Sequence, residues 1–299
     1  MTTVSVAVPR KGRPLEAVLE RIATSADATD IADEIISTLR YEKAVTKGSQ
    51  GAEEHVYDRL ADYSDVTDST SPEYSLLRDD REGMPRRLVF DSVTIPTPDG
   101  DLQLIGREEP FRALRKHEFA LGFDSADLVL EEVVELRGDP LTDLAAVNER
   151  IDPMDTDVRL RTGLGDTVYH TLLSTPEVAP SGGGALDRSF VADYTGEICI
   201  SPRYERLVEA ILGTDALDGV EFVYPEAGQT EEAAVAEAGL GVYLTVTGST
   251  AREHGLVVGE SLFPSETVLL ENASERTDAT DRIASLIAGD DIDTELALV

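Results

Sequence analysis

The chain contains the stretch Val242-Tyr243-Leu244-Thr245-Val246-Thr247-Gly248-Ser249-Thr250-Ala251-Arg252-Glu253-His254-Gly255-Leu256. Its β-branched and aromatic residues 242–246 predict a strand. Residues 251–254 predict a turn of helix, and Gly255 is placed to end it. The stretch therefore predicts a strand, a short polar loop and the start of a helix.

The loop in the middle of this stretch has features of an anion-binding turn. Backbone N–H groups at the start of a helix lie at the positive end of its dipole and favour phosphate. Gly248 permits close approach of the backbone, and the hydroxyls of Thr247, Ser249 and Thr250 add donors. An ordinary strand-to-helix turn explains the same residues, so both interpretations stay open.

The composition is strongly acidic. The 299 residues include 59 Asp and Glu against 26 Lys and Arg, a formal net charge of −33, and the acidic residues are spread along the whole chain. Such an excess favours a protein that stays soluble in a high-salt cytoplasm, where salt screens the repulsion. It argues against nucleic acid and anionic membranes as partners, because both need a basic face.

Cysteine content and hydropathy exclude several classes of protein. Cys199 is the only cysteine, so there is no internal disulfide and no multi-cysteine metal site. Its apolar surroundings favour a core residue. We find no apolar run long enough to span a membrane and no signal peptide, and we expect a cytoplasmic protein.

The N-terminal segment places a basic turn after a strand. Val4–Val8 predicts a buried strand, and the spacing of apolar residues over Leu15–Ile22 predicts a helix. Between them lie Arg10, Lys11 and Arg13. These cations either face an anionic ligand at the carboxyl end of the strand, where open α/β sheets place their sites, or form a solvated turn.

The rest of the chain alternates strands with helices, which predicts mainly parallel sheets. Asp124, Ser125 and Asp127 follow one strand and either cap the next helix or contact ligand hydroxyls. The predicted strands are 102–106, 119–124, 197–201, 220–224 and 265–272, and the predicted helices are 108–117, 128–134, 141–150, 168–173, 205–212, 233–238 and 280–288.

Taken in order, several segments resemble those of the ATP phosphoribosyltransferase family, the first enzyme of histidine biosynthesis. The segments that carry the resemblance are 6–13, 107–110, 120–128, 200–204, 228–231, 247–256 and 272–274. The resemblance implies an α/β, bilobal, periplasmic-binding-protein-like (type II) fold with two mixed or parallel sheets and a cleft between the lobes. We expect residues 1–135 plus 262–299 to form the first lobe, and residues 136–261 to form the second.

The resemblance also implies ligands and site residues. The ligands are phosphoribosyl pyrophosphate and ATP, with Mg²⁺ as cofactor and no assigned metal ligands, in a homo-oligomer, dimer or higher. The implied catalytic residues are Lys11, Arg13 and Glu231, and the implied phosphate- and nucleotide-binding residues are Arg10, Asp124, Ser125, Asp127, Thr247, Gly248, Ser249 and Thr250. The expected activity is transfer of the phosphoribosyl group to N1 of ATP.

The chain departs from the family pattern at Tyr243, because the family has an aspartate shortly before its threonine-glycine loop. This departure supports a second hypothesis. In it, the chain is a paralogue that binds phosphoribosyl pyrophosphate or a nucleotide and acts as a sensor or as the partner of a transferase. A third hypothesis is an unrelated α/β protein whose loops mimic the pattern.

Overall fold

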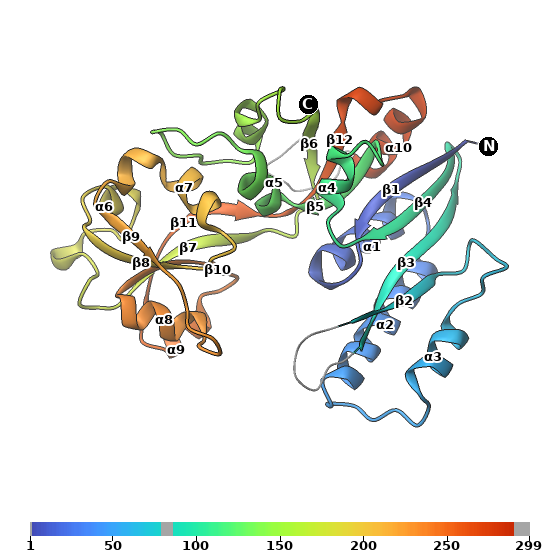
Figure 1. Cartoon of the computed structure of the whole chain (residues 1–299), viewed down its shortest axis with the longest axis horizontal. Helices are drawn as coiled ribbons and strands as arrows, with labels where there is room; N and C mark the ends of the chain where they lie inside the picture. The colour runs from blue at the N-terminus through green and yellow to red at the C-terminus, as the bar shows by residue number, and fades with distance from the viewer. Residues whose placement is uncertain (1, 79–85, 290–299) are drawn as a thin grey trace.

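The computed structural model describes residues 2–78 and 86–289, and it contains two lobes, each built on a mixed sheet (Figure 1). In spatial order, the first sheet consists of β2 (Glu73–Arg78), β3 (Arg86–Thr97), β4 (Gly100–Arg107), β1 (Thr3–Pro9), β5 (Leu121–Ser125), β12 (Thr267–Asn272) and β6 (Val158–Gly163). The second consists of β11 (Val257–Ser265), β7 (Val168–Ser174), β10 (Leu240–Thr245), β8 (Gly196–Ile200) and β9 (Val220–Val223). The predicted bilobal α/β fold is confirmed.

The two sheets share one order of strands. In the first sheet β4, β1 and β5 run parallel, and β12 is inserted antiparallel between β5 and β6. In the second sheet β9, β8 and β10 run parallel, and β7 is inserted antiparallel between β10 and β11. In both sheets the inserted strand is the first one after the chain arrives from the other lobe. The repeated arrangement fits the type II periplasmic-binding-protein-like fold that the resemblance implied.

The chain passes between the sheets twice, through residues 164–167 and through Glu266. Our expected lobe boundaries lie elsewhere, at 135/136 and 261/262, but β6 belongs to the first sheet and β11 to the second. The division of the chain into two folding units stays a prediction. Residues 290–299, which we expected in the first lobe, lie outside the described residues. The two crossings are tied together, because Asp166 accepts hydrogen bonds from the Thr267 backbone N–H at 2.7 Å and its hydroxyl at 2.8 Å.

Helices cover the sheets and bury the apolar positions that predicted them. On α1 (Gly12–Ser25), the side chains of Leu15, Val18, Leu19 and Ile22 are buried in the core of the first lobe. The other helices are α2 (Thr29–Thr46), α3 (Val56–Tyr63), α4 (Pro110–Arg115), α5 (Ala126–Val133), α6 (Arg188–Ala192), α7 (Glu205–Leu212), α8 (Glu231–Ala238), α9 (Ser249–Glu253) and α10 (Asp278–Ala288). Among the described residues, no helix is both long and apolar enough to cross a membrane.

Two predicted helices are wrong. Residues 168–173 form the strand β7, because β10 and β11 flank it on both sides and satisfy its backbone. Residues 141–150 contain only a 3₁₀ helix, Ala145–Arg150. The prediction of mainly parallel sheets is wrong, because most strand pairings are antiparallel; the parallel ones among the described residues are β4–β1, β1–β5, β10–β8 and β8–β9. The sheets are mixed, the other form that the resemblance implied.

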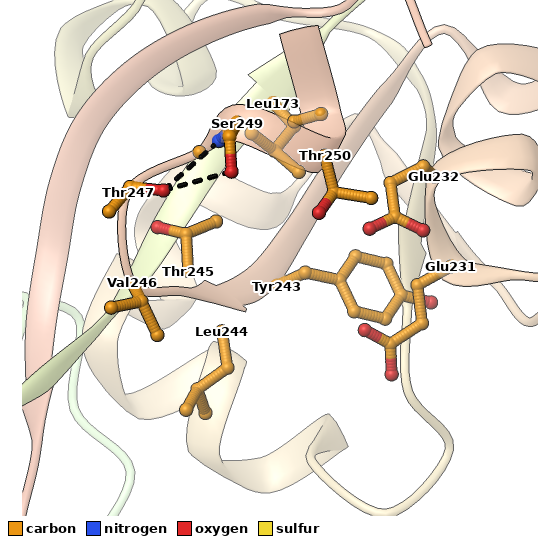
Figure 2. Close-up of a pocket in the computed structure, with 12 residues that line it drawn as sticks. Leu173, Glu231, Glu232, Tyr243, Leu244, Thr245, Val246, Thr247, Ser249 and Thr250 are labelled. Atoms are coloured by element: carbon orange, nitrogen blue, oxygen red, sulfur yellow. Dashed lines mark hydrogen bonds between the residues drawn. The ribbon is translucent and has the colours of Figure 1, made fainter. Parts of the chain in front are cut away.

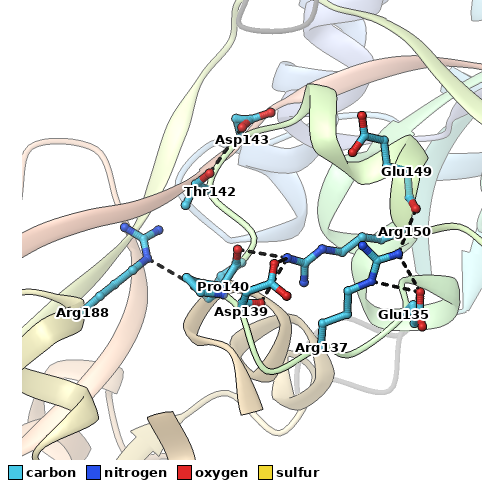
Figure 3. A network of polar contacts seen from close by, with 10 residues as sticks. Glu135, Arg137, Asp139, Pro140, Thr142, Asp143, Glu149, Arg150 and Arg188 are labelled. Atoms are coloured by element: carbon cyan, nitrogen blue, oxygen red, sulfur yellow. Dashed lines mark hydrogen bonds and ion pairs between the residues drawn. The ribbon is translucent and has the colours of Figure 1, made fainter. Parts of the chain in front are cut away.

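The segment after α5 fastens the lobes to each other. Arg150 is buried and donates to the Asp139 carboxylate at 2.6 Å and to the Pro140 carbonyl at 3.0 Å (Figure 3). The same segment reaches α7 of the second lobe, where Leu141 N–H donates to the Ala210 carbonyl at 2.9 Å. One hydrophobic core accordingly runs from β1 and α5 through α7 to β10.

Candidate functional site

A pocket of about 210 Å³ opens beside the loop that follows β10. We call it the loop pocket; it is lined by Leu173, Glu231, Glu232 and residues 243–251. Figure 2 shows Thr247 and Ser249 on one side of this pocket and Glu231 and Glu232 on the other. The structure therefore brings together five of the predicted site residues: Glu231, Thr247, Gly248, Ser249 and Thr250.

The loop takes its shape from Gly248. This residue has a φ of 66° and a ψ of 14°, in the left-handed region that favours glycine. A Cβ at this position would lie 3.0 Å from Cγ2 of Val258, so any side chain would also crowd β11. The predicted strand, loop and helix start are confirmed.

Hydroxyl groups, rather than cations, line the open side of the loop. The Thr247 and Ser249 hydroxyls lie 3.0 Å apart, and the Ser249 backbone N–H donates to the Thr247 hydroxyl at 3.4 Å. Arg252 stabilises the loop, because its guanidinium donates to the Thr247 carbonyl at 2.8 Å. The loop can therefore offer neutral donors to an anion.

Two carboxylates face the loop from the first turn of α8. The helix begins after Thr230, whose hydroxyl accepts from Ala233 N–H at 3.3 Å. Burial raises the pKa of Glu231, and the neighbouring charge of Glu232 raises it further. A pair of carboxylates that repel each other is stabilised by a cation, and Mg²⁺ commonly joins one or two carboxylates to substrate phosphates. The donor set thus fits Mg²⁺ bound together with a phosphorylated ligand.

Tyr243 forms the floor of the loop pocket without offering it a reactive group. The residue is 4% exposed, and its hydroxyl lies 3.4 Å from the sulfur of Cys199, itself buried as predicted. Burial raises the pKa of Tyr243 far above its usual range. The side chain therefore stays protonated near neutral pH and cannot replace the charge of an aspartate.

A second pocket, of about 510 Å³, lies between the lobes. We call it the interlobe pocket. It is lined by Lys11, Glu108, Glu109, Phe111, Arg112, Asp124, Leu128, Glu131 and Glu132 of the first lobe and by Arg203 of the second. Two of the predicted residues, Lys11 and Asp124, thus lie together, but away from the loop pocket's lining. Lys11 contacts Glu108 at 3.1 Å.

Asp124 is the buried acid of the interlobe pocket. Its two carboxylate oxygens accept the backbone N–H groups of Phe111 at 3.0 Å and Ser125 at 2.9 Å. Burial raises the pKa of Asp124 to about 7, although those two bonds and the charge of Arg203 act in the opposite direction. The group can therefore change its charge near neutral pH.

Two of the predicted cations make contacts within the first lobe or at the crossings. Arg10 donates to the Phe90 carbonyl at 3.1 Å and to Asp91 at 2.9 Å, which fixes the turn on β3. Arg13 pairs with Asp166 at 3.1 Å, so it lies at the crossing between the sheets. Neither of them lines the loop pocket or the interlobe pocket.

The remaining predicted residues, Ser125 and Asp127, hold the start of α5. The Ser125 hydroxyl accepts Asp127 N–H at 3.4 Å and so caps the helix, one of the two alternatives left open. Asp127 is buried and joins the lobes, because its carboxylate contacts His170 at 3.2 Å and accepts the Ser265 hydroxyl at 2.9 Å. Contact of either residue with a ligand stays a prediction.

Sequence reasoning did not assign roles to Arg112, Arg203 and Glu232. Arg203 follows a strand in the segment 200–204, which carries part of the family resemblance. Glu232 is the neighbour of the predicted site residue Glu231. The sequence therefore gave grounds to consider both of them. Arg112 carried none, because only the fold brings α4 to this pocket. Within residues 2–78 and 86–289, no three His, Cys, Asp or Glu side chains gather as a metal site.

Comparison with known proteins places the sequence in a family. It matches Halobacterial ATP phosphoribosyltransferase over residues 1–298, whereas the search of curated proteins finds no match. The chain is similar to the ATP phosphoribosyl transferase (HisG:HisZ) complex from Thermotoga maritima, with 14% identity, coverage of 95% of this chain and 94% of that one, and a TM-score of 0.43. It is also similar to YhfZ from Shigella flexneri, with 10% identity, coverage of 97% and 98%, and a TM-score of 0.38.

The family match extends over nearly the whole chain, including both lobes, the loop pocket and the interlobe pocket. The chain belongs to the halobacterial ATP phosphoribosyltransferase family.

Proposed function

We propose that this chain transfers the phosphoribosyl group of phosphoribosyl pyrophosphate to N1 of ATP, in the cytoplasm. The observation that carries the proposal is the loop pocket, where hydroxyl and backbone donors face two carboxylates across a space open to a small anion. The family match supports the same reaction.

The loop pocket would hold the ribosyl donor. The 5′-phosphate would accept hydrogen bonds from the backbone and hydroxyls of Thr247, Ser249 and Thr250, and Gly248 would let the backbone approach it. Because these donors are neutral, they would bind phosphate through the geometry of their hydrogen bonds rather than through net charge. The ribose would then lie toward Glu231, which can accept a bond from a ribose hydroxyl.

Mg²⁺ would bind at the two carboxylates of the loop pocket. Glu231 would hold it through water, with Glu232 adding charge, and phosphate oxygens of the ligand would complete its shell. Once bound, the ion would neutralise charge on the departing pyrophosphate.

The interlobe pocket and the turn before α1 would hold the anionic groups of the second substrate and of the leaving group. Lys11, Arg13 and Arg10 are the proposed cations, and Asp124, Ser125 and Asp127 would lie near the adenine nucleotide. Approach of the lobes would orient N1 in line with the ribosyl carbon and keep water out. In such transfers the protein contributes mainly through positioning and charge stabilisation.

Calorimetry with product analysis tests the proposal. Phosphoribosyl pyrophosphate is titrated into the protein in molar KCl with Mg²⁺, ATP is added, and release of pyrophosphate is followed by ³¹P NMR. We expect saturable binding, then pyrophosphate release with formation of a phosphoribosylated nucleotide detected by mass spectrometry. A folded protein that binds neither ligand would contradict the proposal.

Tyr243 favours a second candidate function. Its buried phenol stands where an aspartate is typical of the family, and its hydroxyl contacts Cys199 rather than the pocket. The chain would then bind phosphoribosyl pyrophosphate without turnover, as a sensor or as the partner of a transferase. Binding without pyrophosphate release supports this candidate, and light scattering at the same salt tests the proposed homo-oligomer, which a monomer at all concentrations would exclude.

A further inference from the structure

A buried polar contact joins α5 of the first lobe to β7 of the second, and the proposed function does not use it. Of the four histidines, all within the described residues, only His170 is buried, at 1% exposure. Its Nε2 lies 3.2 Å from the carboxylate of Asp127, which is itself 3% exposed. The second oxygen of that carboxylate accepts the Ser265 hydroxyl at 2.9 Å. Both oxygens of Asp127 therefore contact side chains of the second sheet.

This contact restricts how the two lobes can lie against each other. The core that runs between them is otherwise apolar around this point, with Leu130, Leu172 and Phe263 among its members. Apolar side chains tolerate a small shift, whereas a buried carboxylate is costly unless its hydrogen bonds are kept. The ring of Tyr204 packs edge-on against the imidazole of His170, with centroids 5.5 Å apart, and limits its rotation. The contact thus favours one relative orientation of the lobes.

On the first lobe, the contact is directly connected to the interlobe pocket. Asp127 lies in the first turn of α5, and the residues on either side of it, Asp124 and Leu128, both line that pocket. Ser125 caps the helix through the Asp127 N–H, so the segment 124–128 is held as one unit. A shift of α5 would therefore move this wall of the interlobe pocket.

On the second lobe, the contact is connected to the loop pocket through β7. Thr171 follows His170 on this strand, and its hydroxyl lies 2.6 Å from the hydroxyl of Thr245, which lines the loop pocket. Leu173, two residues further along β7, lines the same pocket. One strand therefore carries both the contact with α5 and part of the loop pocket.

We propose that Asp127 and His170 form a positioning pair, which holds the interlobe pocket and the loop pocket in the relative orientation that group transfer requires. The inference rests on the proposed function. Neither side chain acts on a substrate directly, because the pair acts through α5 and β7. A misplacement of about 1 Å between reacting groups can slow a reaction by about 100-fold. Loss of the pair should therefore slow transfer while each pocket keeps its own ligand.

The test uses variants of the full chain. His170→Phe keeps a ring against Tyr204 and removes the N–H donor, and His170→Leu makes the same loss with a different shape, in case the first variant does not fold. His170→Gln keeps an N–H donor and serves as the rescue variant. Arg206→Gln is the matched control, because Arg206 of α7 also reaches α5, through the Val134 carbonyl at 3.2 Å, but lines neither pocket. Circular dichroism and urea unfolding identify conditions in which each protein is folded.

Two measurements separate positioning from binding. Steady-state assays of pyrophosphate release in molar KCl with Mg²⁺ give kcat, and calorimetry gives the Kd of phosphoribosyl pyrophosphate and of ATP, each added alone. We expect kcat of the His170→Phe variant to fall by about 100-fold, with each Kd changed by less than about threefold. The His170→Gln variant should recover kcat to within about tenfold of the parent, and the Arg206→Gln variant to within about threefold.

The outcomes that would overturn the inference differ from those that would overturn the proposed function. An unchanged kcat in a folded His170→Phe protein, an equal loss in the Arg206→Gln control, or a loss confined to the Kd of one ligand would overturn the inference alone. So would a His170→Gln variant as slow as His170→Phe, because the retained N–H would then have no effect. A parent protein that releases no pyrophosphate would contradict the proposed transfer, and this inference with it.

Discussion

The loop pocket and the interlobe pocket offer an anion two different kinds of donor. In the loop pocket the donors are hydroxyls and backbone N–H groups, and the nearest arginine, Arg252, binds the loop itself. The interlobe pocket has charged groups of both signs: Lys11, Arg112 and Arg203, the buried acid Asp124, and Glu108, Glu109, Glu131 and Glu132, with Lys11 and Arg112 paired to glutamates. We therefore expect the first pocket to select a ligand by shape and the second by charged contacts, so pH and salt should act on them unequally.

Asp124 in the interlobe pocket should give the strongest dependence of stability on pH. An unfolded Asp loses its proton near 3.8, whereas burial raises the pKa of Asp124 to about 7. Between these values the folded protein holds the extra proton, so stability falls as pH rises through this window. Asp124→Asn removes this titrating group. We therefore expect the free energy of unfolding of the parent, measured relative to that of the variant, to fall by a few kcal/mol between about pH 4 and pH 8. The estimate uses about 1.4 kcal/mol per unit of pKa shift.

Urea unfolding at several pH values measures this difference. Asp62→Asn provides the control, because Asp62 is exposed on α3. If the unfolding free energies of the parent and of the Asp124 variant change with pH in the same way, the buried acid does not make the interlobe pocket pH-dependent.

The next effect concerns shape in the loop pocket. Gly248→Val places a branched side chain at a positive φ and against Val258, and we expect binding of phosphoribosyl pyrophosphate to weaken by about 100-fold or more. Gly255→Val is the matched control, since Gly255 also has a positive φ, of 76°, but has open space around its Cβ. Both variants should lose about 1–2 kcal/mol of stability to backbone strain. Equal binding by the two variants, measured by calorimetry, would refute selection by shape.

A smaller effect should follow from removing one cation of the interlobe pocket. Lys11→Ala should weaken ATP binding by about tenfold, because a charge-assisted contact to phosphate is lost. The loss should shrink as KCl increases, whereas binding at the loop pocket should change less with salt. Lys116→Ala, an exposed lysine after α4, is the control. Unchanged affinity in titrations of the Lys11 variant would remove the lysine from the site.

The smallest effect is expected at Tyr243. Tyr243→Phe keeps the ring and removes only the hydroxyl that contacts Cys199, so stability should change by no more than about 1 kcal/mol. Turnover, if the parent shows it, should stay within about threefold, because a protonated phenol supplies no charge. A loss of turnover beyond tenfold in steady-state assays would give the phenol a role that its burial argues against.

Local patterns predicted much of the fold and part of the sites. The strand and loop around Gly248 follow from residues close in sequence, and so does the helix that buries Leu15 and Leu19. Residues 168–173 were assigned to the wrong element, because an apolar run fits either period until its neighbours are known. The strand β11 was not predicted; Gly259 and Pro264 interrupt its pattern, and its pairing with β7 shifts register twice.

The sites were harder to predict, because their residues come together only through long-range topology. Part of the loop pocket could be predicted from one stretch of sequence, since Thr247, Gly248, Ser249 and Thr250 are consecutive. In the interlobe pocket, Lys11 and Arg203 come from different lobes, and no spacing in the sequence indicates that they meet.

The late return of the chain to the first lobe has a consequence for synthesis. Each sheet receives its inserted strand, β12 or β7, directly after the chain arrives from the other lobe. A growing chain therefore lacks the strand that joins β6 to the rest of its first sheet until residue 272 has been made, although β1, β4 and β5 emerge early. Pairing between such distant segments is slow. The strands of the second sheet, by contrast, all come from the continuous segment 168–265, so that sheet can form before the first sheet is complete.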